Sequence, residues 1–178
     1  MNLQKDTGIT REAPLEEQSI CITCGLCCDC TLFLNAWLNP GERGHLPEKI
    51  EQASFRDGDK EYFRLPCKYF SEQCTIYDRK RPYVCGSYRC QLLRDFAGGK
   101  ISMDDALELV REAKGMRREI IEEYCRIYGK SEAINFREIM TELGKIRKPD
   151  PGEGAMSADH EHLLARCNIF EALLIKHF

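Results

Sequence analysis

Ten consecutive positions, residues 21–30, hold five cysteines in the stretch CITCGLCCDC. Cys21 and Cys24 form a C-x-x-C pair, in which two intervening residues let the chain curl until both sulfurs reach one ion. Gly25 suits the tight turn that such a curl needs. Thiolates are soft ligands that favour zinc, copper(I) and iron–sulfur clusters over magnesium or calcium. The stretch therefore predicts a thiolate metal site.

A second block of cysteines follows between residues 67 and 90, with the spacing C-x6-C-x10-C-x4-C. Together with the first block it makes eight candidate ligands, which match two four-coordinate sites or one multinuclear site. The predicted metal ligands are Cys21, Cys24, Cys27, Cys28, Cys67, Cys74, Cys85 and Cys90.

Two of these ligands are direct neighbours, Cys27 and Cys28. Side chains of adjacent residues in an extended segment point in opposite directions. Unless the backbone turns sharply there, the two sulfurs should serve different metals or different atoms of one cluster. We therefore expect each site to draw sulfurs from both blocks.

Three further cysteines and two histidines stand outside this pattern. Cys30 is either an additional ligand or a bystander. Cys125 and Cys167 occupy apolar positions of predicted helices, where a thiol packs like a small hydrophobic group. His160 and His162 are two positions apart and so do not share a helix face. We expect them to have surface or capping roles rather than to ligate metal.

The composition of the whole chain guides the interpretation of the cysteines. The net charge is −3, which leaves no electrostatic footprint for general nucleic-acid binding. We find no apolar core of a secretory signal and no run of about 18 apolar residues, so we expect a cytoplasmic protein without a membrane partner. Structural disulfides are rare in that reducing compartment, and 11 cysteines cannot all pair. Metal binding or redox chemistry is favoured.

The predicted fold is mainly α, with a small irregular metal-stapled α+β N-terminal half. We expect residues 1–18 to be a tail and residues 19–97 to form the cysteine-cluster domain. Within that domain, KIEQASF predicts a short helix, and EYFRLPCKYF (61–70) predicts a strand that Pro66 limits to an edge or an end. Residues 98–178 predict a helical region packed on the cysteine-cluster domain.

Three helices make up this C-terminal part. The first has a capping-box-like start at Ser102 and runs to Tyr128, where Gly129 ends it. The second begins at about Ser131 and the third at about Ser157, each with apolar residues at intervals of three or four.

The two segments CITCGLCC and CKYFSEQCTIYDRKRPYVCGSYRC resemble the CxxCxxCC, or YkgJ-type, cysteine-cluster family, which is described as zinc- or iron-chelating. The resemblance covers residues 21–90 and implies metal binding through the same eight cysteines, with no agreed reaction. Cys30 is an addition to the family pattern, and Gly86 stands where members often carry arginine. A related cluster occurs in bacterial flagellin lysine methylases, so an enzymatic function is an alternative that the resemblance also allows.

Cations and aromatic residues accompany the second block. Four thiolates around one divalent ion carry a net charge of −2, which nearby cations and hydrogen-bond donors offset. A solvated basic face is the alternative explanation. Tyr69 and Tyr77 are candidates to cover the site. The cations concerned are Lys68, Arg79, Lys80, Arg81 and Arg89.

The sequence allows more than one metal and more than one function for the cysteine cluster. Zinc predicts closed tetrahedral sites whose binding energy would fold the irregular half. Cys21, Cys24 and Cys27 have the C-x2-C-x2-C spacing of iron–sulfur proteins, without the ferredoxin-like fourth ligand. We expect a metal-binding protein whose helices offer a surface to a protein partner.

The first alternative is an iron–sulfur redox enzyme or a methylase-like enzyme. No Gly-rich nucleotide loop of the G-x-G-x-x-G or Walker type is present to support it. The second is a thiol–disulfide oxidoreductase, which needs two working cysteines rather than eight. A zinc-based nucleic-acid module is weakened by the negative net charge.

Serine substitutions test the ligand assignment. Cys24→Ser or Cys74→Ser should lower the metal content and unfold the N-terminal half, because each removes a thiolate. Cys167→Ser should leave the metal content unchanged. Elemental analysis of the purified variants measures this, and equal metal loading in all three would contradict the assignment.

Overall fold

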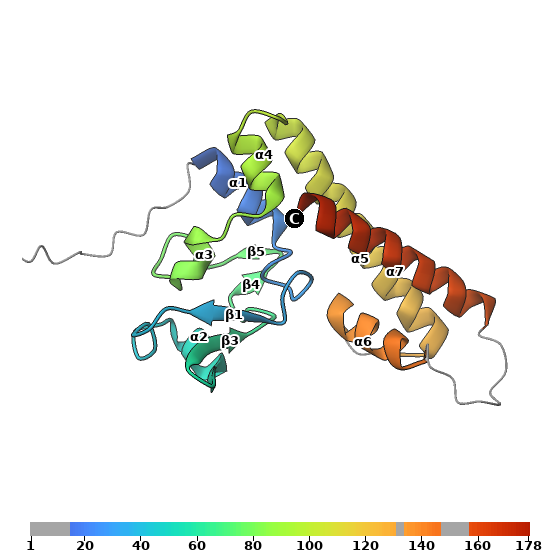
Figure 1. Cartoon of the computed structure of the whole chain (residues 1–178), viewed down its shortest axis with the longest axis horizontal. Coiled ribbons are helices and arrows are strands. Elements are labelled where there is room, and N and C mark those ends of the chain that lie inside the picture. The colour runs from blue at the N-terminus through green and yellow to red at the C-terminus, as the bar shows by residue number, and fades with distance from the viewer. Residues whose placement is uncertain (1–14, 131–133, 147–156) are drawn as a thin grey trace, which may run out of the picture.

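A long helix, α5 (Met103–Tyr128), is the central element of the helical part. In the computed structural model, which describes residues 15–130, 134–146 and 157–178, α7 (Ala158–His177) runs back alongside α5 (Figure 1). The shorter α6 (Phe136–Ile146) packs against α5 as well. These three helices and a small sheet confirm the predicted fold class, mainly α with a small α+β part.

Local signals in the sequence set both ends of α5. Ser102 Oγ accepts a hydrogen bond from the Asp105 N–H at 3.1 Å, and the Asp105 carboxylate accepts one from the Ser102 N–H at 3.2 Å. Gly129 ends the helix in the left-handed conformation, with φ at 61°. Both predicted ends are confirmed.

The other two C-terminal helices also begin at capping residues. Ser157 caps α7 by accepting from the His160 N–H at 3.3 Å, as predicted. Helix α6 begins later than predicted, because the side chains of Asn135 and Glu138 exchange hydrogen bonds with each other's backbone N–H. The predicted start at Ser131 lies outside the described residues.

The N-terminal part alternates short helices with short strands. Its elements are α1 (Leu15–Cys24), β1 (Asn35–Leu38), α2 (Glu48–Ala53), β2 (Ser54–Asp57), β3 (Lys60–Arg64), β4 (Phe70–Ser71), β5 (Gln73–Cys74), α3 (Tyr83–Ser87) and α4 (Gln91–Ala97). The predicted tail of residues 1–18 is too long, because α1 already begins at Leu15. Glu17 in its first turns is buried and pairs with Arg89, which anchors this segment.

Strand β3 is the centre of an antiparallel sheet of order β1-β3-β2. The strand predicted within residues 61–70 therefore exists but does not lie at an edge. It ends at Arg64, before Pro66, which agrees with the expectation that proline limits the strand at its end. β4 and β5 form a separate two-stranded hairpin.

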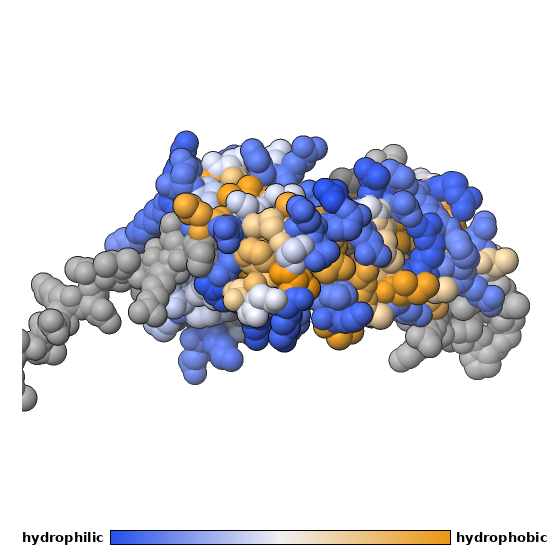
Figure 2. All heavy atoms as spheres, turned by 90° about the horizontal axis from the view of Figure 1, so that it is seen from above, coloured by the Kyte–Doolittle hydropathy of each residue, from blue (hydrophilic) through white to orange (hydrophobic). Residues whose placement is uncertain are grey.

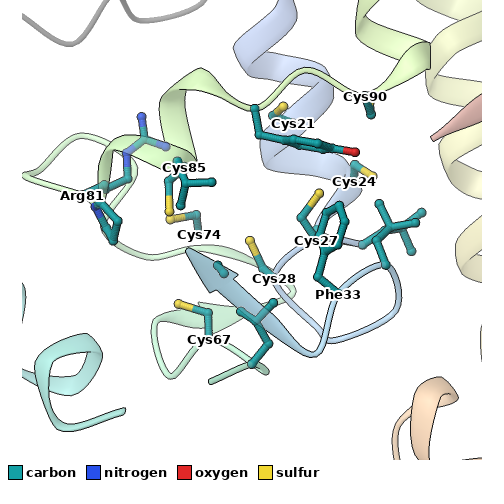
Figure 3. Close-up of a pocket in the computed structure, with 18 of the residues that line it drawn as sticks. Cys21, Cys24, Cys27, Cys28, Phe33, Cys67, Cys74, Arg81, Cys85 and Cys90 are labelled. Carbon is teal, nitrogen blue, oxygen red and sulfur yellow. The ribbon is translucent and has the colours of Figure 1, made fainter. Parts of the chain in front are cut away.

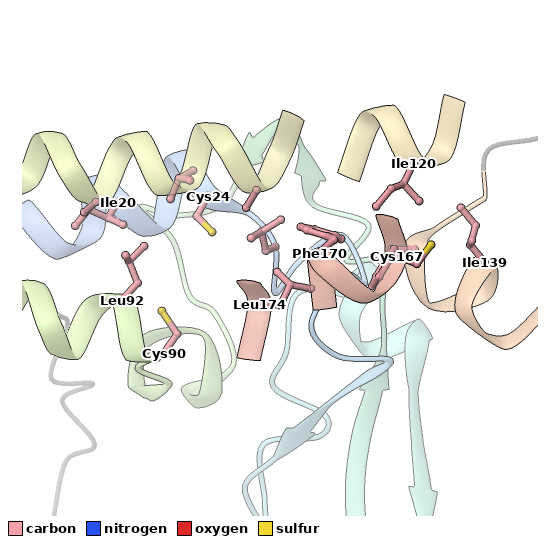
Figure 4. Packing of buried hydrophobic residues seen from close by; sticks show 14 of the residues in the cluster. Ile20, Cys24, Cys90, Leu92, Ile120, Ile139, Cys167, Phe170 and Leu174 are labelled. Carbon is pink, nitrogen blue, oxygen red and sulfur yellow. The ribbon is translucent and has the colours of Figure 1, made fainter. Parts of the chain in front are cut away.

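The main hydrophobic core crosses the predicted boundary between residues 97 and 98. Ile20 of α1 and Leu92 of α4 pack in the same cluster as Phe170 and Leu174 of α7 (Figure 4). A smaller core beneath the sheet consists of Leu38, Ile50, Phe63 and Ile76. The cysteine-bearing half thus holds a small core of its own and shares the large one.

Seen from above, apolar residues form a central band with hydrophilic residues around it (Figure 2). No helix in the described part of the chain combines the length and apolarity needed to cross a bilayer.

Two adjacent residues of α7 test the large core. Phe170 is fully buried, whereas Ile169 is 62% exposed. Phe170→Ala should lower the free energy of unfolding by about 3–5 kcal/mol because it leaves a cavity. Ile169→Ala should change it by no more than about 0.5 kcal/mol. Urea denaturation measures both, and similar losses in the two variants would contradict this packing.

Candidate metal centre

All eight predicted ligands line one cavity of about 300 Å³ (Figure 3). They come from α1, the turn after it, the segment between β3 and β4, strand β5, α3 and the residue before α4. The other three cysteines of the chain do not line it. Cys30 is 1% exposed and lies near Glu138 and Arg137 of α6, which favours the bystander reading. Cys167 packs in the helical core as predicted.

A left-handed turn at Gly25 places the first block. Cys21 and Cys24 are three residues apart on α1 and so share a face. The chain then turns at Gly25, with φ at +69°, and the Cys28 N–H donates to the Gly25 carbonyl at 2.8 Å. This turn brings Cys27 and Cys28 to the cavity wall, which confirms the role expected of Gly25.

A backbone hydrogen bond joins the two blocks. The Cys67 N–H donates to the Cys28 carbonyl at 2.7 Å, so the second block begins where the first one ends in space. Cys74 follows in β5. Pro82 precedes α3 and brings in Cys85, whose side chain points toward that of Cys74 although this helical turn is exposed (Figure 3).

The electrostatic neighbours of the thiols group the eight cysteines into two sets that meet at Cys27 and Cys28. Burial raises the pKa of Cys21 to about 11, and Cys90 adds to this. Burial likewise raises the pKa of Cys24 to about 12, with contributions from Cys90 and Cys21. Burial is the first cause that raises the pKa of Cys27, and the next causes in order are Cys24, Cys28, Cys90 and Cys21. The first set consists of Cys21, Cys24, Cys27 and Cys90.

The second set surrounds Cys28. Burial raises the pKa of this thiol, and the next causes in order are Cys85, Cys67, Cys74 and, from the first set, Cys24. Although the Cys85 residue is exposed, its sulfur points toward Cys74 (Figure 3), and loss of hydration there, followed by Cys67, raises the pKa of Cys85 to about 12. The second set consists of Cys28, Cys67, Cys74 and Cys85.

Cys27 and Cys28 adjoin each other where the two sets meet. We assign them to different sets because the other thiol neighbours of Cys27 belong to the first set, whereas those of Cys28 belong mainly to the second. Each set then takes members from both blocks.

The thiols line the wall of the cavity without meeting at one point. No three Cys, His, Asp or Glu side chains in the described ranges stand close enough together to hold an ion. Cysteine has one side-chain torsion, and its staggered rotamers move the sulfur between the wall and the interior. Ligation in this cavity requires such rotations.

One of the five predicted cations reaches the cavity. Arg81 lines it and lowers the pKa of both Cys21 and Cys85, against the effect of burial. Its guanidinium lies 3.8 Å from the ring centre of Tyr77, which also lines the cavity. Arg89 is held by Glu17 instead. The other three cations, Lys68, Arg79 and Lys80, are exposed.

Backbone N–H groups also favour the charged form of several thiols. The Leu26 N–H lowers the pKa of Cys24, and the N–H groups of Tyr69 and Phe70 lower that of Cys67. The first residues of α4 do the same for Cys90. These donors stabilise thiolates at fixed positions, as the surroundings of metal-bound thiolates do.

The helical half supplies residues that the sequence pattern did not reveal. Lys114 of α5 donates to the Thr23 carbonyl at 3.0 Å and lowers the pKa of Cys24. Arg117 of α5 pairs with Asp29. A signal for this pair was present in the sequence, because Asp29 is the sole charged residue between positions 18 and 39 and a charge in such a stretch needs a partner.

Arg137 of α6 holds the far end of the cysteine turn. Its Nε donates to the Thr31 carbonyl at 2.8 Å, and a terminal nitrogen donates to the Leu32 carbonyl at 3.1 Å. The turn is therefore fastened to α5 and to α6 on either side of Cys30.

No protein-family model matches this chain, and neither a curated protein nor a solved structure matches it. The resemblance to the CxxCxxCC family therefore stays a prediction.

Gly25 offers a direct test of the turn. A Cβ at this position would lie 2.1 Å from Phe70 Cζ, and the positive φ would strain any L side chain. Gly25→Ala should lower the free energy of unfolding by at least about 1 kcal/mol. Gly86→Ala is the matched control beside Cys85, where a Cβ meets nothing within 4 Å. Urea denaturation measures the difference, and equal stability of the two variants would contradict this geometry.

Proposed function

We propose that the protein binds metal at two centres, one held by the first set of four cysteines and one by the second. The observation that carries this proposal is which cysteines line the cavity. The eight cysteines that the spacing singles out line one cavity, and the other three do not. Burial of unrelated apolar thiols would not separate the cysteines along the lines of the ligand pattern.

The surroundings of the thiols fit bound thiolates. Eight thiols that ionise in one apolar cavity repel one another, and burial adds to that cost. A divalent ion at each set cancels part of the charge, while Arg81 and the backbone donors offset part of the remainder. Metal binding then releases the thiol protons, because the thiolate is the ligand.

The raised thiol pKa values count against a thiol–disulfide oxidoreductase. The attacking cysteine of such an enzyme has a lowered pKa, which makes it a thiolate at neutral pH. At this cavity burial raises the pKa of Cys21 to about 11 and that of Cys24 to about 12. Without metal these thiols are protonated and weakly nucleophilic.

A structural role in the cysteine-bearing half follows from its small core. Four buried residues beneath the sheet are a modest source of stability, and a structural metal adds its binding free energy directly to folding. Four-thiolate sites suit zinc and iron alike. A protein partner at the helical half stays a prediction.

Iron–sulfur clusters are the second candidate, and the size of the cavity favours them. Two bare ions would fill a small part of about 300 Å³, whereas clusters with inorganic sulfide would fill more. The four cysteines of each set are the number that one such cluster takes. In that case the protein would transfer electrons or support a methylase-like enzyme.

The adjacent cysteines separate the two centres. Cys27→Ser should remove the metal of the first set and leave that of the second, and Cys28→Ser should do the reverse, so each variant loses about half of the metal per chain. Cys21→Ser combined with Cys27→Ser should lose no more than Cys27→Ser alone, because both ligands serve one centre. Elemental analysis and visible spectra measure the remaining metal.

Cys125→Ser is the control, since Cys125 lies away from the cavity and should keep the full metal content. Loss of all metal in both single variants would indicate one shared cluster and contradict two centres. Full loading in both would contradict ligation by these cysteines altogether.

A further inference from the structure

The first set of thiols stands on elements that belong to the large hydrophobic core. Cys24 of α1 and Cys90, which directly precedes α4, are themselves buried members of that core, and Cys21 packs against it. Ile20 and Leu92, next to them on the same two helices, are each 1% exposed. Moving a thiol of this set away from the cavity therefore requires opening the core that α1 and α4 share with α5 and α7.

The second set includes one thiol on a short helix without buried residues. Cys85 is the middle residue of α3, and none of the five residues of this helix is buried. Val84 packs partly against the small core, and the ring of Tyr83 meets that of Trp37 edge-on while both stay more than a third exposed. Segments with few buried apolar contacts open locally at a small part of the cost of global unfolding. Helix α3 can therefore move and take Cys85 with it while the large core stays intact.

A carboxylate in the loop before α2 fastens the start of α3. Glu42 Oε1 accepts a hydrogen bond at 2.6 Å from the N–H of Tyr83, the first residue of α3. Glu42 Oε2 accepts another at 2.6 Å from the Asn39 N–H in its own loop. The other end of α3 is held separately, because the hydroxyl of its C-capping residue Tyr88 donates to the Phe178 carbonyl at 3.2 Å. Glu42 thus ties down the end of α3 that lies two residues before Cys85.

We propose that metal enters and leaves the protein at the second centre, with Cys85 as the ligand that dissociates and Glu42 as the positioning residue that limits its movement. The inference rests on the two metal centres proposed above. When α3 moves, the bond between Cys85 and the metal breaks, and the metal keeps the other three thiolates of the second set. The released thiolate takes up a proton, and an incoming ligand forms a bond at the vacated position.

The two centres then have different roles. An open coordination position distinguishes reactive metal sites from closed structural ones. The first centre, on packed helices, stays closed and stabilises the fold. The second centre exchanges its metal through movement of a single short helix.

Release of zinc to a chelator measures the difference between the centres. The full chain reconstituted with Zn²⁺ is mixed with a chromophoric chelator, and the absorbance of the zinc–chelator complex is followed with time. We expect two phases of equal size, one at least about tenfold faster than the other. Cys28→Ser should abolish the fast phase and Cys27→Ser the slow one, which assigns each phase to a centre.

Glu42→Gln tests the fastening of α3. Glutamine has one acceptor oxygen where Glu42 uses two, and its NH₂ group would face a backbone N–H. The fast phase should accelerate at least about tenfold, because a hydrogen bond to a charged acceptor is lost, and the slow phase should not change. Glu48→Gln is the matched control, since the Glu48 carboxylate accepts from the Gln52 side chain within α2. Both phases should keep their rates in this variant.

Alkylation of the unaltered, zinc-loaded protein identifies the ligand that dissociates. Iodoacetamide followed by peptide mass mapping should modify Cys85 before the other seven cavity cysteines. Three results would overturn the inference and leave the two centres in place: release of about two zinc per chain in one phase, modification of Cys24 or Cys90 before Cys85, and equal acceleration of both phases by Glu42→Gln. Protein that takes up no zinc would overturn the inference and the proposed function together.

Discussion

The crowding of eight thiols around one apolar cavity is the physical constraint on which the rest of the structure depends. Burial and neighbouring thiols raise the pKa values around the cavity, most clearly at Cys27 and Cys28, where the two sets adjoin. A protein that keeps such a cavity must either leave the thiols protonated or supply positive charge. Backbone donors and Arg81 supply part of it, and the proposed metal ions supply the rest.

Helices α5 and α6 hold the cysteine-bearing turn in place. The turn between Gly25 and Leu32 holds two of the eight thiols that line the cavity, those of Cys27 and Cys28, next to its own charged residue, Asp29. Arg117 of α5 pairs with that carboxylate, and Arg137 of α6 takes the carbonyls at the end of the turn. Because both arginines stand on helices with a large shared core, the turn is fastened to the most extensively packed part of the protein. The division into a cysteine domain and a helical domain is therefore less sharp than composition implies.

Local signals explain what the sequence predicted well. Ser102, Gly129 and Ser157 act through neighbours within four residues, so they mark helix ends without knowledge of the fold. The cysteines that line the cavity were also recognisable, because ligand spacing is a local property. The later start of α6 departs from the prediction, because Asn135 and Glu138 cap the helix after Ile134, an apolar residue that the periodicity alone places inside it.

Tertiary pairing explains what the sequence did not reveal. The division into two sets depends on the backbone hydrogen bond from the Cys67 N–H to the Cys28 carbonyl. The sequence of neither block indicates that these two residues pair. Arg117 and Arg137 act on residues far from them in the chain. Glu17 lies in α1 and pairs with Arg89, which is 72 residues away in the chain. The polar composition of the N-terminus gives no sign of this partner. The central position of β3 likewise depends on β1 and β2, which have four residues each and are too short to be predicted from the sequence.

Metal K-edge X-ray absorption of the anaerobically purified protein, combined with metal quantification, tests the central claim most directly. The account predicts two centres per chain, each metal surrounded by sulfur at about 2.3 Å with no nitrogen or oxygen ligand. A metal–metal distance in the spectrum would identify iron–sulfur clusters within the same ligand sets. Protein that binds no metal, or metal bound through nitrogen and oxygen, would contradict it.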